Sequence, residues 1–136
     1  MVPDWVAEYI GIPYVEDGRD RAGLDCFGLL GLIWRERYGA DLLRYDGPHW
    51  RKGADPREIG AAIAHEVSRY AEIAAGEEKE GDGIILRMRG HPLHLGLVVS
   101  PGWMVHVHET AASCLENYRG MAWNRRVIGF RRYCHV

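Results

Sequence analysis

The sequence predicts an α+β domain in which helices come first and an antiparallel sheet follows. Apolar residues recur at helical spacing up to about Gly76, whereas beyond Gly81-Asp82-Gly83 they alternate with a period of two. Helices that precede the strands, rather than alternating with them, favour an antiparallel over a parallel sheet. With 136 residues the chain has the length of one domain, which we expect to span residues 1–136.

Residues 24–38 give the clearest helical pattern. Their apolar side chains recur at intervals of three and four residues, as on one face of an amphipathic helix: Leu29, Leu30, Ile33, Trp34 and Tyr38. Asp25 stands where an N-cap belongs, and Gly39 suits the position after the last turn. The pattern therefore places Cys26 in the first turn of this helix.

Two further helices flank this one. Residues 4–10 are predicted to form a short helix that Gly11-Ile12-Pro13 ends. Residues 55–76 are predicted to form another, since Asp55 is a good cap and Pro56 suits the first helical position. The connecting segments are predicted to be loops: 14–23 and 42–53.

About five antiparallel strands are predicted in the second half, at 84–88, 93–99, 103–108, 114–118 and 126–133. Ser100-Pro101-Gly102 marks a tight turn, so the strands on either side of it should form a hairpin. Side chains alternate between the two faces of a strand. His94 and His106 can therefore be neighbours on one face, opposite the apolar face that carries Leu95 and Leu97.

The composition excludes several classes of protein. A net charge of −2 indicates no obligatory nucleic-acid partner, and no apolar run approaches the ~20 residues that span a bilayer. No basic segment followed by an apolar stretch opens the chain, so we expect no signal peptide and synthesis in the cytoplasm. Three cysteines, Cys26, Cys114 and Cys134, do not make a disulfide framework, and at least one thiol stays free in a monomer.

Cys26 is the candidate nucleophile. A helix N-terminus carries partial positive charge and unpaired N–H groups, which favour the thiolate and lower a cysteine pKa. Gly23 and Gly28 flank the thiol and could let a substrate backbone come close. The alternative is that Cys26 is a small buried apolar residue. The pair of histidines favours the nucleophile, because a cysteine nucleophile needs a base and a partner that orients the base.

A metal site is the competing interpretation of the histidines. His91, His94, His106 and His108 supply four imidazoles within one hairpin, and three of them with a cysteine could hold zinc. However, His91 and His94 differ in strand parity, and the chain shows neither CxxC nor HExxH spacing. We therefore predict no metal and no cofactor.

These motifs together resemble the NlpC-type cell-wall peptidases, which are papain-like cysteine endopeptidases. Tyr14 and the run Gly23–Leu29 resemble the nucleophile motif, and Gly81–Ile85 resembles the next strand. His94–Val99 followed by Trp103–His106 resembles the paired histidine motif, with matching separation. The C-terminal residues resemble the phage-tail and gene-transfer-agent branch of the family: Trp123, Arg126–Phe130 and Tyr133.

The resemblance implies a papain-like fold and a reaction. Cys26 would be the nucleophile, His94 the general base and His106 the group that orients His94. The expected reaction is hydrolysis of the bond between D-γ-glutamate and a diamino acid in the peptidoglycan stem peptide, through a thioester acyl-enzyme. The expected partners are this stem peptide and, for the phage-like branch, phage tail proteins. The resemblance also implies that the protein is located in a virion tail or at the bacterial cell wall.

Three further residues are implicated in substrate binding. The resemblance implies that Tyr14 lines the site and contributes to the oxyanion hole, and that Asp25 recognises the free amino end of the stem peptide. Asp25 as a plain N-cap and Tyr14 as plain packing stay open. Phe27 departs from the serine that many members carry after the cysteine, so it is expected to reshape substrate binding. A catalytically quiet tail-assembly module and another thiol-dependent amidase or acyl transferase remain alternatives.

Overall fold

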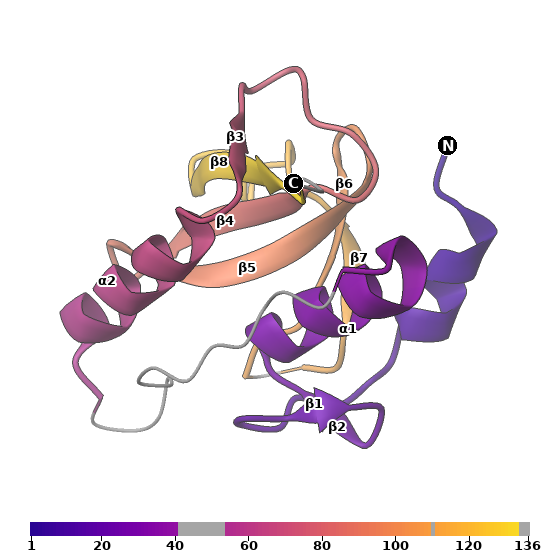
Figure 1. Cartoon of the computed structure of the whole chain (residues 1–136), viewed down its shortest axis with the longest axis horizontal. Helices are drawn as coiled ribbons and strands as arrows, with labels where there is room; N and C mark the ends of the chain where they lie inside the picture. Colours follow the sequence, from indigo (N-terminus) through magenta and orange to yellow (C-terminus); the bar gives the residue numbers. More distant parts are fainter. Residues whose placement is uncertain (41–53, 110, 134–136) are drawn as a thin grey trace.

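A six-stranded antiparallel sheet forms the centre of the computed structural model, which describes residues 1–40, 54–109 and 111–133 (Figure 1). Its spatial order is β3-β8-β4-β5-β6-β7. The strands are β3 (Ala71–Ile73), β4 (Gly83–Met88), β5 (His91–Ser100), β6 (Trp103–His106), β7 (Cys114–Asn117) and β8 (Val127–Arg132). The α+β class is confirmed, and the five strands expected from the sequence are present with a sixth, β3, added at the edge.

The helices cover one face of this sheet. Helix α1 (Cys26–Tyr38) and helix α2 (Pro56–Val67) both pack on β5, and Figure 1 shows both helices on the same side of that strand. A 3₁₀ helix, η1 (Asp4–Tyr9), lies outside α1 where a short helix was expected. The segment predicted as a loop before α1 contains a small hairpin of β1 (Arg19–Asp20) and β2 (Gly23–Leu24). The predicted 42–53 loop lies outside the described residues.

Helix α1 begins and ends as its cap residues predict. The Asp25 carboxylate accepts the Gly28 backbone N–H at 2.8 Å, which satisfies one of the unpaired donors of the first turn. Gly39 follows the last turn with φ +65°, a left-handed conformation that glycine adopts without steric cost. Cys26 is therefore the first residue of the helix, and Leu24 belongs to β2 rather than to the helix.

Helix α2 is shorter than predicted. It starts at Pro56 with Asp55 as its cap, as expected, but it ends at Val67 rather than near Gly76. The following residues pair with β8 as an edge strand, with Ala71 opposite Arg132 and Ile73 opposite Phe130. Pairing with a distant strand has overridden the local helical spacing, because three ladder residues carry little periodic signal of their own.

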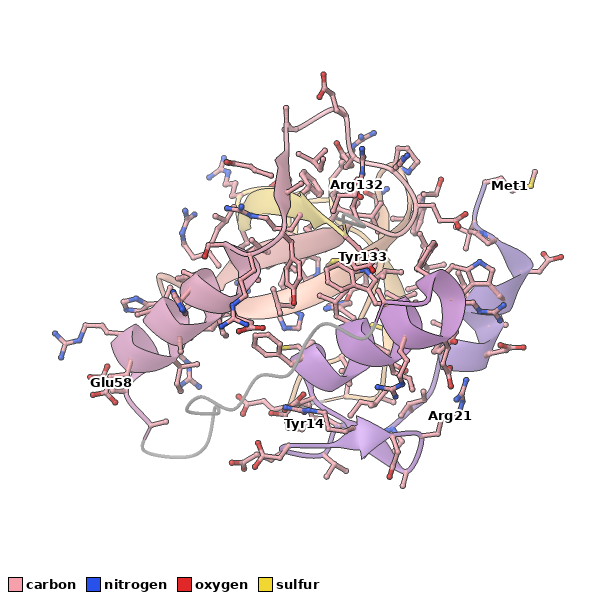
Figure 2. The ribbon with its side chains drawn as sticks, in the orientation of Figure 1. Met1, Tyr14, Arg21, Glu58, Arg132 and Tyr133 are labelled. Carbon is pink, nitrogen blue, oxygen red and sulfur yellow. The ribbon has the colours of Figure 1, made fainter. Side chains whose placement is uncertain are left out.

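Two apolar layers sandwich the sheet. Leu95, Leu97 and Val99 of β5 pack under the helices, whereas Val98 faces the second layer. That layer includes Met104, Tyr118, Trp123 and Phe130. Arg21 and Glu58 point outward from the helical side, and Tyr133 contacts Trp34 of α1 with ring centroids 6.3 Å apart (Figure 2). No helix among the described residues is long and apolar enough to cross a membrane.

Candidate active site

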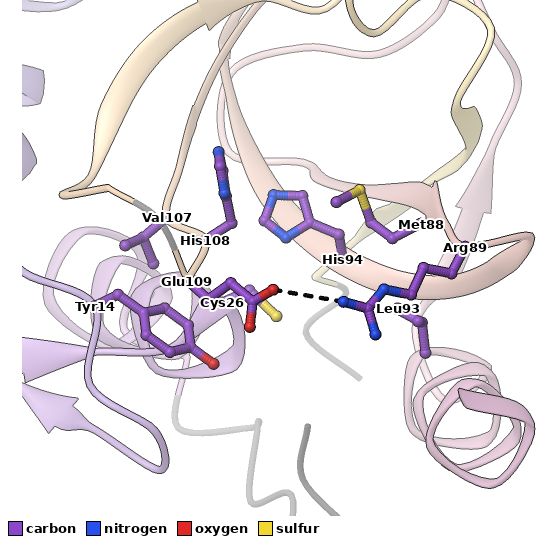
Figure 3. Close-up of a pocket in the computed structure, with 9 residues that line it drawn as sticks. All are labelled: Tyr14, Cys26, Met88, Arg89, Leu93, His94, Val107, His108 and Glu109. Carbon is purple, nitrogen blue, oxygen red and sulfur yellow. Dashed lines mark ion pairs between the residues drawn. The ribbon is translucent and has the colours of Figure 1, made fainter. Parts of the chain in front are cut away.

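A pocket opens where the first turn of α1 meets the first half of β5 (Figure 3). Cys26 and Tyr14 line one side, and His94 reaches it from β5. The segments that follow β4 and β6 supply the remaining wall. The full lining is Tyr14, Cys26, Met88, Arg89, Leu93, His94, Val107, His108 and Glu109. The sequence-predicted nucleophile and base thus share one cavity.

Burial favours the protonated form of the Cys26 thiol. Burial raises its pKa to about 12, and the neighbouring Asp25 carboxylate acts in the same direction. Backbone hydrogen bonds with Leu95 and Phe27 oppose this rise without cancelling it. The direction is opposite to the one that the helix N-terminus alone predicts, because burial disfavours the charged thiolate. Attack by this sulfur therefore requires a base that takes its proton.

His94 and His106 are neighbours across the β5–β6 hairpin. Gly96 pairs with His106 across the β5–β6 hairpin, and His94 Nε2 lies 2.8 Å from His106 Nδ1. Both rings are buried, with His94 3% exposed and His106 0% exposed. Burial is the main reason that the pKa of His94 lies well below 6.5, and neighbouring His106 and His108 lower it further. His94 is therefore a neutral imidazole at neutral pH.

Glu116 and Trp123, to which the sequence analysis assigned no role in the site, complete this hydrogen-bonded group. His106 Nε2 lies 2.9 Å from Glu116 Oε1, and the indole N–H of Trp123 donates to Glu116 Oε2 at 2.8 Å. Burial by itself would raise the pKa of Glu116, but the hydrogen bonds from His106 and Trp123 hold it below its usual value. The group therefore ends in an ionised carboxylate.

The carboxylate sets the direction of the hydrogen bonds. An ionised carboxylate only accepts, so His106 carries its proton on Nε2 and donates it to Glu116. His106 Nδ1 is then an acceptor for the Nε2–H of His94. The remaining nitrogen of His94, Nδ1, is left with a lone pair. This is the tautomer in which His94 can accept a proton from the thiol.

Trp123 holds the two imidazoles in place. Its ring stacks on His94 with centroids 5.7 Å apart and meets His106 edge-on at 5.0 Å. The guanidinium of Arg126 covers the Trp123 ring at 5.4 Å. A stacked indole limits rotation of His94 and also favours the imidazolium, since the face of an aromatic ring attracts cations.

The three predicted substrate-binding residues lie in different surroundings. Tyr14 lines the pocket, and burial raises the pKa of its hydroxyl, so it stays a hydrogen-bond donor. Asp25 caps α1 and forms an ion pair with Arg19 at 2.6 Å, and it does not line the pocket. Phe27 is 5% exposed and packs in the core beneath the helices. The roles of all three in substrate binding stay predictions.

The glycines near the thiol serve packing rather than access to the pocket. A Cβ on Gly28 would collide with the backbone oxygen of Gly18, and one on Gly23 would collide with the side chain of Val15. The loop before α1 therefore lies directly against the first turn of the helix. This corrects the expectation that these two glycines leave room for a substrate backbone.

Charged pocket residues also went unpredicted. Arg89 of the β4–β5 turn and Glu109, after β6, form an ion pair at 3.7 Å across the pocket mouth (Figure 3). Neither residue follows a periodic pattern, so the sequence carried no signal for the pair. For Glu116 the sequence did carry a signal. Pairing of the predicted 103–108 and 114–118 strands places alternate residues of both strands on one face.

Ligand atoms suited to a metal converge at a different place from the one considered in the sequence. Among the described residues they come from His106, Cys114 and Glu116, whose donor atoms all lie within 4.8 Å of one another. Of the four hairpin histidines considered as ligands, only His106 belongs to this group.

Known proteins resemble this chain over most of its length. The model of the NlpC/P60 family matches residues 11–132. The murein DD-endopeptidase MepS/murein LD-carboxypeptidase of Escherichia coli K12 is 21% identical over 131 residues, covering 96% of this chain and 61% of that protein. Protein P54 of Enterococcus faecium is 25% identical over 99 residues, covering 73% of this chain and 16% of its own length. The chain thus spans about three fifths of the length of the MepS relatives.

Solved structures show the same fold. An NlpC/P60 family protein from Bacillus cereus aligns with a TM-score of 0.71 at 19% identity, covering 98% of this chain and 41% of that one. The NlpC/p60 domain of the peptidoglycan hydrolase SagA aligns with a TM-score of 0.65 at 20% identity, covering 93% and 92%. The family match over residues 11–132, together with this shared papain-like α+β fold, shows that the chain belongs to the NlpC/P60 family.

Proposed function

We propose that this chain is a cysteine peptidase that hydrolyses peptidoglycan stem peptides at the bond between D-γ-glutamate and a diamino acid. Membership of the NlpC/P60 family and likeness to a murein endopeptidase support this proposal. The observation that carries it is geometric. Cys26 shares a pocket with His94, and the far nitrogen of the His94 ring is held by His106.

The first half-reaction starts from neutral groups. The Cys26 sulfur attacks the carbonyl carbon of the scissile bond while its proton passes to His94 Nδ1. The carbonyl oxygen becomes an oxyanion that the Cys26 backbone N–H stabilises at the start of α1, a type of donor worth about 3 kcal/mol. Tyr14 supplies a second donor, because its hydroxyl stays protonated and lines the same pocket.

Release of the amine completes the first half-reaction, and hydrolysis of the resulting thioester is the second half-reaction, which returns the enzyme to its resting state. The imidazolium of His94 protonates the leaving amine as the C–N bond breaks, which leaves a thioester on Cys26. A water molecule then gives a proton to His94 Nδ1 and attacks the thioester. The proton returns to the sulfur as the carboxylic acid product leaves. Throughout, the ionised Glu116 stabilises positive charge on the two histidines.

The mouth of the pocket suits a charged peptide. Arg89 offers a guanidinium for a substrate carboxylate, and Glu109 offers a carboxylate for a substrate amine. Both are about half exposed, so either can exchange its partner for a substrate group at little cost. A stem peptide carries both carboxylate and amine groups, so it can pair with both Arg89 and Glu109.

The test is digestion of purified muropeptides, with products identified by mass spectrometry. Wild type should cleave after D-γ-glutamate, Cys26→Ala should cleave nothing, and Cys134→Ser serves as the matched thiol control. Cleavage at the sugar–peptide linkage would indicate an amidase instead. No cleavage by folded, reduced wild type would overturn the proposal and favour the assembly module.

We also propose that the protein acts at the cell wall as a component of a phage or prophage tail. The similarity of its C-terminal residues to the phage-tail branch supports this, including Trp123 and the run Arg126–Phe130. Affinity purification from induced lysogens should recover tail proteins with the tagged chain. Recovery of the chain alone, from cells that assemble tails, would contradict the tail association without touching the peptidase.

A further inference from the structure

Three potential metal ligands lie on one face of the β6–β7 pair. His106 is opposite Cys114 in the ladder, and Glu116 follows two residues later on the same face. His106 Nε2 lies 3.6 Å from Cys114 Sγ and 2.9 Å from Glu116 Oε1, and the sulfur lies 3.5 Å from that oxygen. None of these three side chains lines the pocket that holds Cys26, and His106 connects them to it through His94.

The spacing of these atoms is close to that around a tetrahedral zinc ion. Zn–S of about 2.3 Å and Zn–N and Zn–O of about 2.0–2.1 Å give ligand separations of roughly 3.6 Å for N and S, 3.5 Å for S and O, and 3.3 Å for N and O. The first two match the observed distances, and the third requires Glu116 Oε1 to move by a few tenths of an ångström. The Glu116 side chain is 36% exposed, so a water molecule can reach the fourth position.

We propose that His106, Cys114 and Glu116 form a zinc site that switches the peptidase off. A ligand set that mixes nitrogen, sulfur and oxygen atoms binds zinc in preference to magnesium or calcium. Trp123 steadies the site from outside, because its indole N–H holds Glu116 Oε2 while Oε1 is left for the ion. The inhibition rests on the proposed peptidase function, whereas the metal binding does not.

Zinc would act by reversing the hydrogen bonds between the histidines. A neutral imidazole that binds metal through Nε2 carries its proton on Nδ1. His106 would then donate to His94 Nε2, and His94 would carry its proton on Nδ1, the nitrogen that must accept the thiol proton. In net terms, Cys114 releases one proton to solvent and both histidines stay neutral.

The site is tested with metal ions on the whole chain. Titration of wild type with Co²⁺ should produce a sulfur-to-cobalt charge-transfer absorption, and Zn²⁺ should abolish it by displacement. Cys114→Ala should lose this absorption, whereas Cys26→Ala and Cys134→Ser should keep it. In the cleavage assay Cys114→Ala should retain most of the zinc-free activity and need at least about tenfold more zinc for half inhibition.

Two outcomes would overturn the proposal. One is a wild type without the charge-transfer absorption. The other is an absorption that survives Cys114→Ala but disappears in Cys26→Ala, which would place the metal on the nucleophile. Since the cobalt titration needs no substrate, a protein that binds cobalt through Cys114 but cleaves no muropeptide would refute the peptidase and retain the metal site.

Discussion

The two halves of the candidate site are built differently. The nucleophile half, residues 13–28, is a continuous stretch in which a cap and a helix start place the thiol. The base half joins His94 of β5, His106 of β6, Glu116 of β7 and Trp123 of the following loop. Local geometry decides the first, and the register of three strands decides the second.

The difference extends to the chemistry. The nucleophile half lacks the means to ionise its own thiol, since burial and Asp25 raise the pKa of Cys26 to about 12. The base half ends in an ionised carboxylate, which keeps a lone pair on His94 and can stabilise the imidazolium. Reactivity of the sulfur therefore depends on the half that is distant in sequence. The following changes test this dependence.

Among changes in the base half, the largest effect is expected from His94→Ala. It removes a side chain that both lines the pocket with Cys26 and hydrogen-bonds to His106. Muropeptide cleavage should fall by more than about 10⁴-fold, the scale seen when one member of a catalytic triad is removed. His91→Ala, on the same strand but outside the pocket, is the matched control and should retain activity. Comparable losses in both variants would refute the role of His94.

Glu116→Ala should have the next largest effect, a fall in kcat of about 10- to 100-fold, as for other partners that orient a catalytic group. Without the carboxylate, both tautomers of His106 become accessible, and part of the His94 population carries its proton on Nδ1. Nitrogen NMR shifts of the imidazoles report this change directly. The kcat of Glu116→Gln should lie between those of wild type and Glu116→Ala, because an amide oxygen still accepts the His106 proton.

Exposed Glu72→Ala is the matched carboxylate control for Glu116. A Glu116→Ala protein with full activity and an unchanged His94 tautomer would show that the base half needs no anchor. A loss of kcat accompanied by a fall in melting temperature and no tautomer change would assign Glu116 to structure alone.

The contrast between the halves explains what the sequence could reveal. Asp25, Cys26 and Gly39 could be predicted because capping is decided within one turn, and the structure confirms the helix start. The His94–His106 neighbourhood could be predicted because one tight turn sets the register of a hairpin. Their catalytic roles stay predictions that rest on the family resemblance.

The residues that were missed depend on contacts between distant segments. Glu116 enters the site only because β7 pairs with β6 at the register that places Cys114 opposite His106. Strand β3 was predicted as the end of a helix because its pairing with β8 lies about 60 residues away in sequence. The thiol pKa was predicted in the wrong direction, since burial is a property of the packed structure.

A third test uses pH. Burial is the main reason that both His94 and His106 have pKa values below 6.5 in the folded protein, so the unfolded chain binds protons first as the pH falls. The contribution of these two histidines to stability is complete above pH 6.5, the usual histidine pKa, and is lost as the pH falls through their folded-state pKa values. The urea midpoint should therefore decrease between about pH 7.5 and about pH 5.5.

His94→Gln should reduce this pH dependence, whereas exposed His65→Gln should leave it unchanged. Equal slopes in all three proteins would mean that other groups govern acid sensitivity. The comparison isolates the base half, because no histidine occurs in the nucleophile half.

Asp25→Ala tests the nucleophile half separately. The variant loses the N-cap hydrogen bond to Gly28 and the ion pair with Arg19. Its free energy of unfolding should therefore be lower than that of wild type by about 1–2 kcal/mol. Asp4→Ala, an exposed carboxylate, is the control. If Asp25 also binds the substrate amine, KM for peptides with a free amino end rises while KM for N-blocked peptides does not. A uniform change would leave Asp25 as a cap alone.

The smallest effect is expected from Glu109→Gln at the pocket mouth. The ion pair with Arg89 is about half exposed, so its loss should change the free energy of unfolding by less than about 0.5 kcal/mol. A change in KM without a change in kcat is expected, because the pair lies outside the hydrogen-bonded group of His94, His106 and Glu116. Arg89→Gln should affect a different substrate charge, so the two variants should rank amidated and carboxylate-bearing stem peptides in opposite orders. Identical rankings would indicate that the pair shapes the pocket without reading substrate charge.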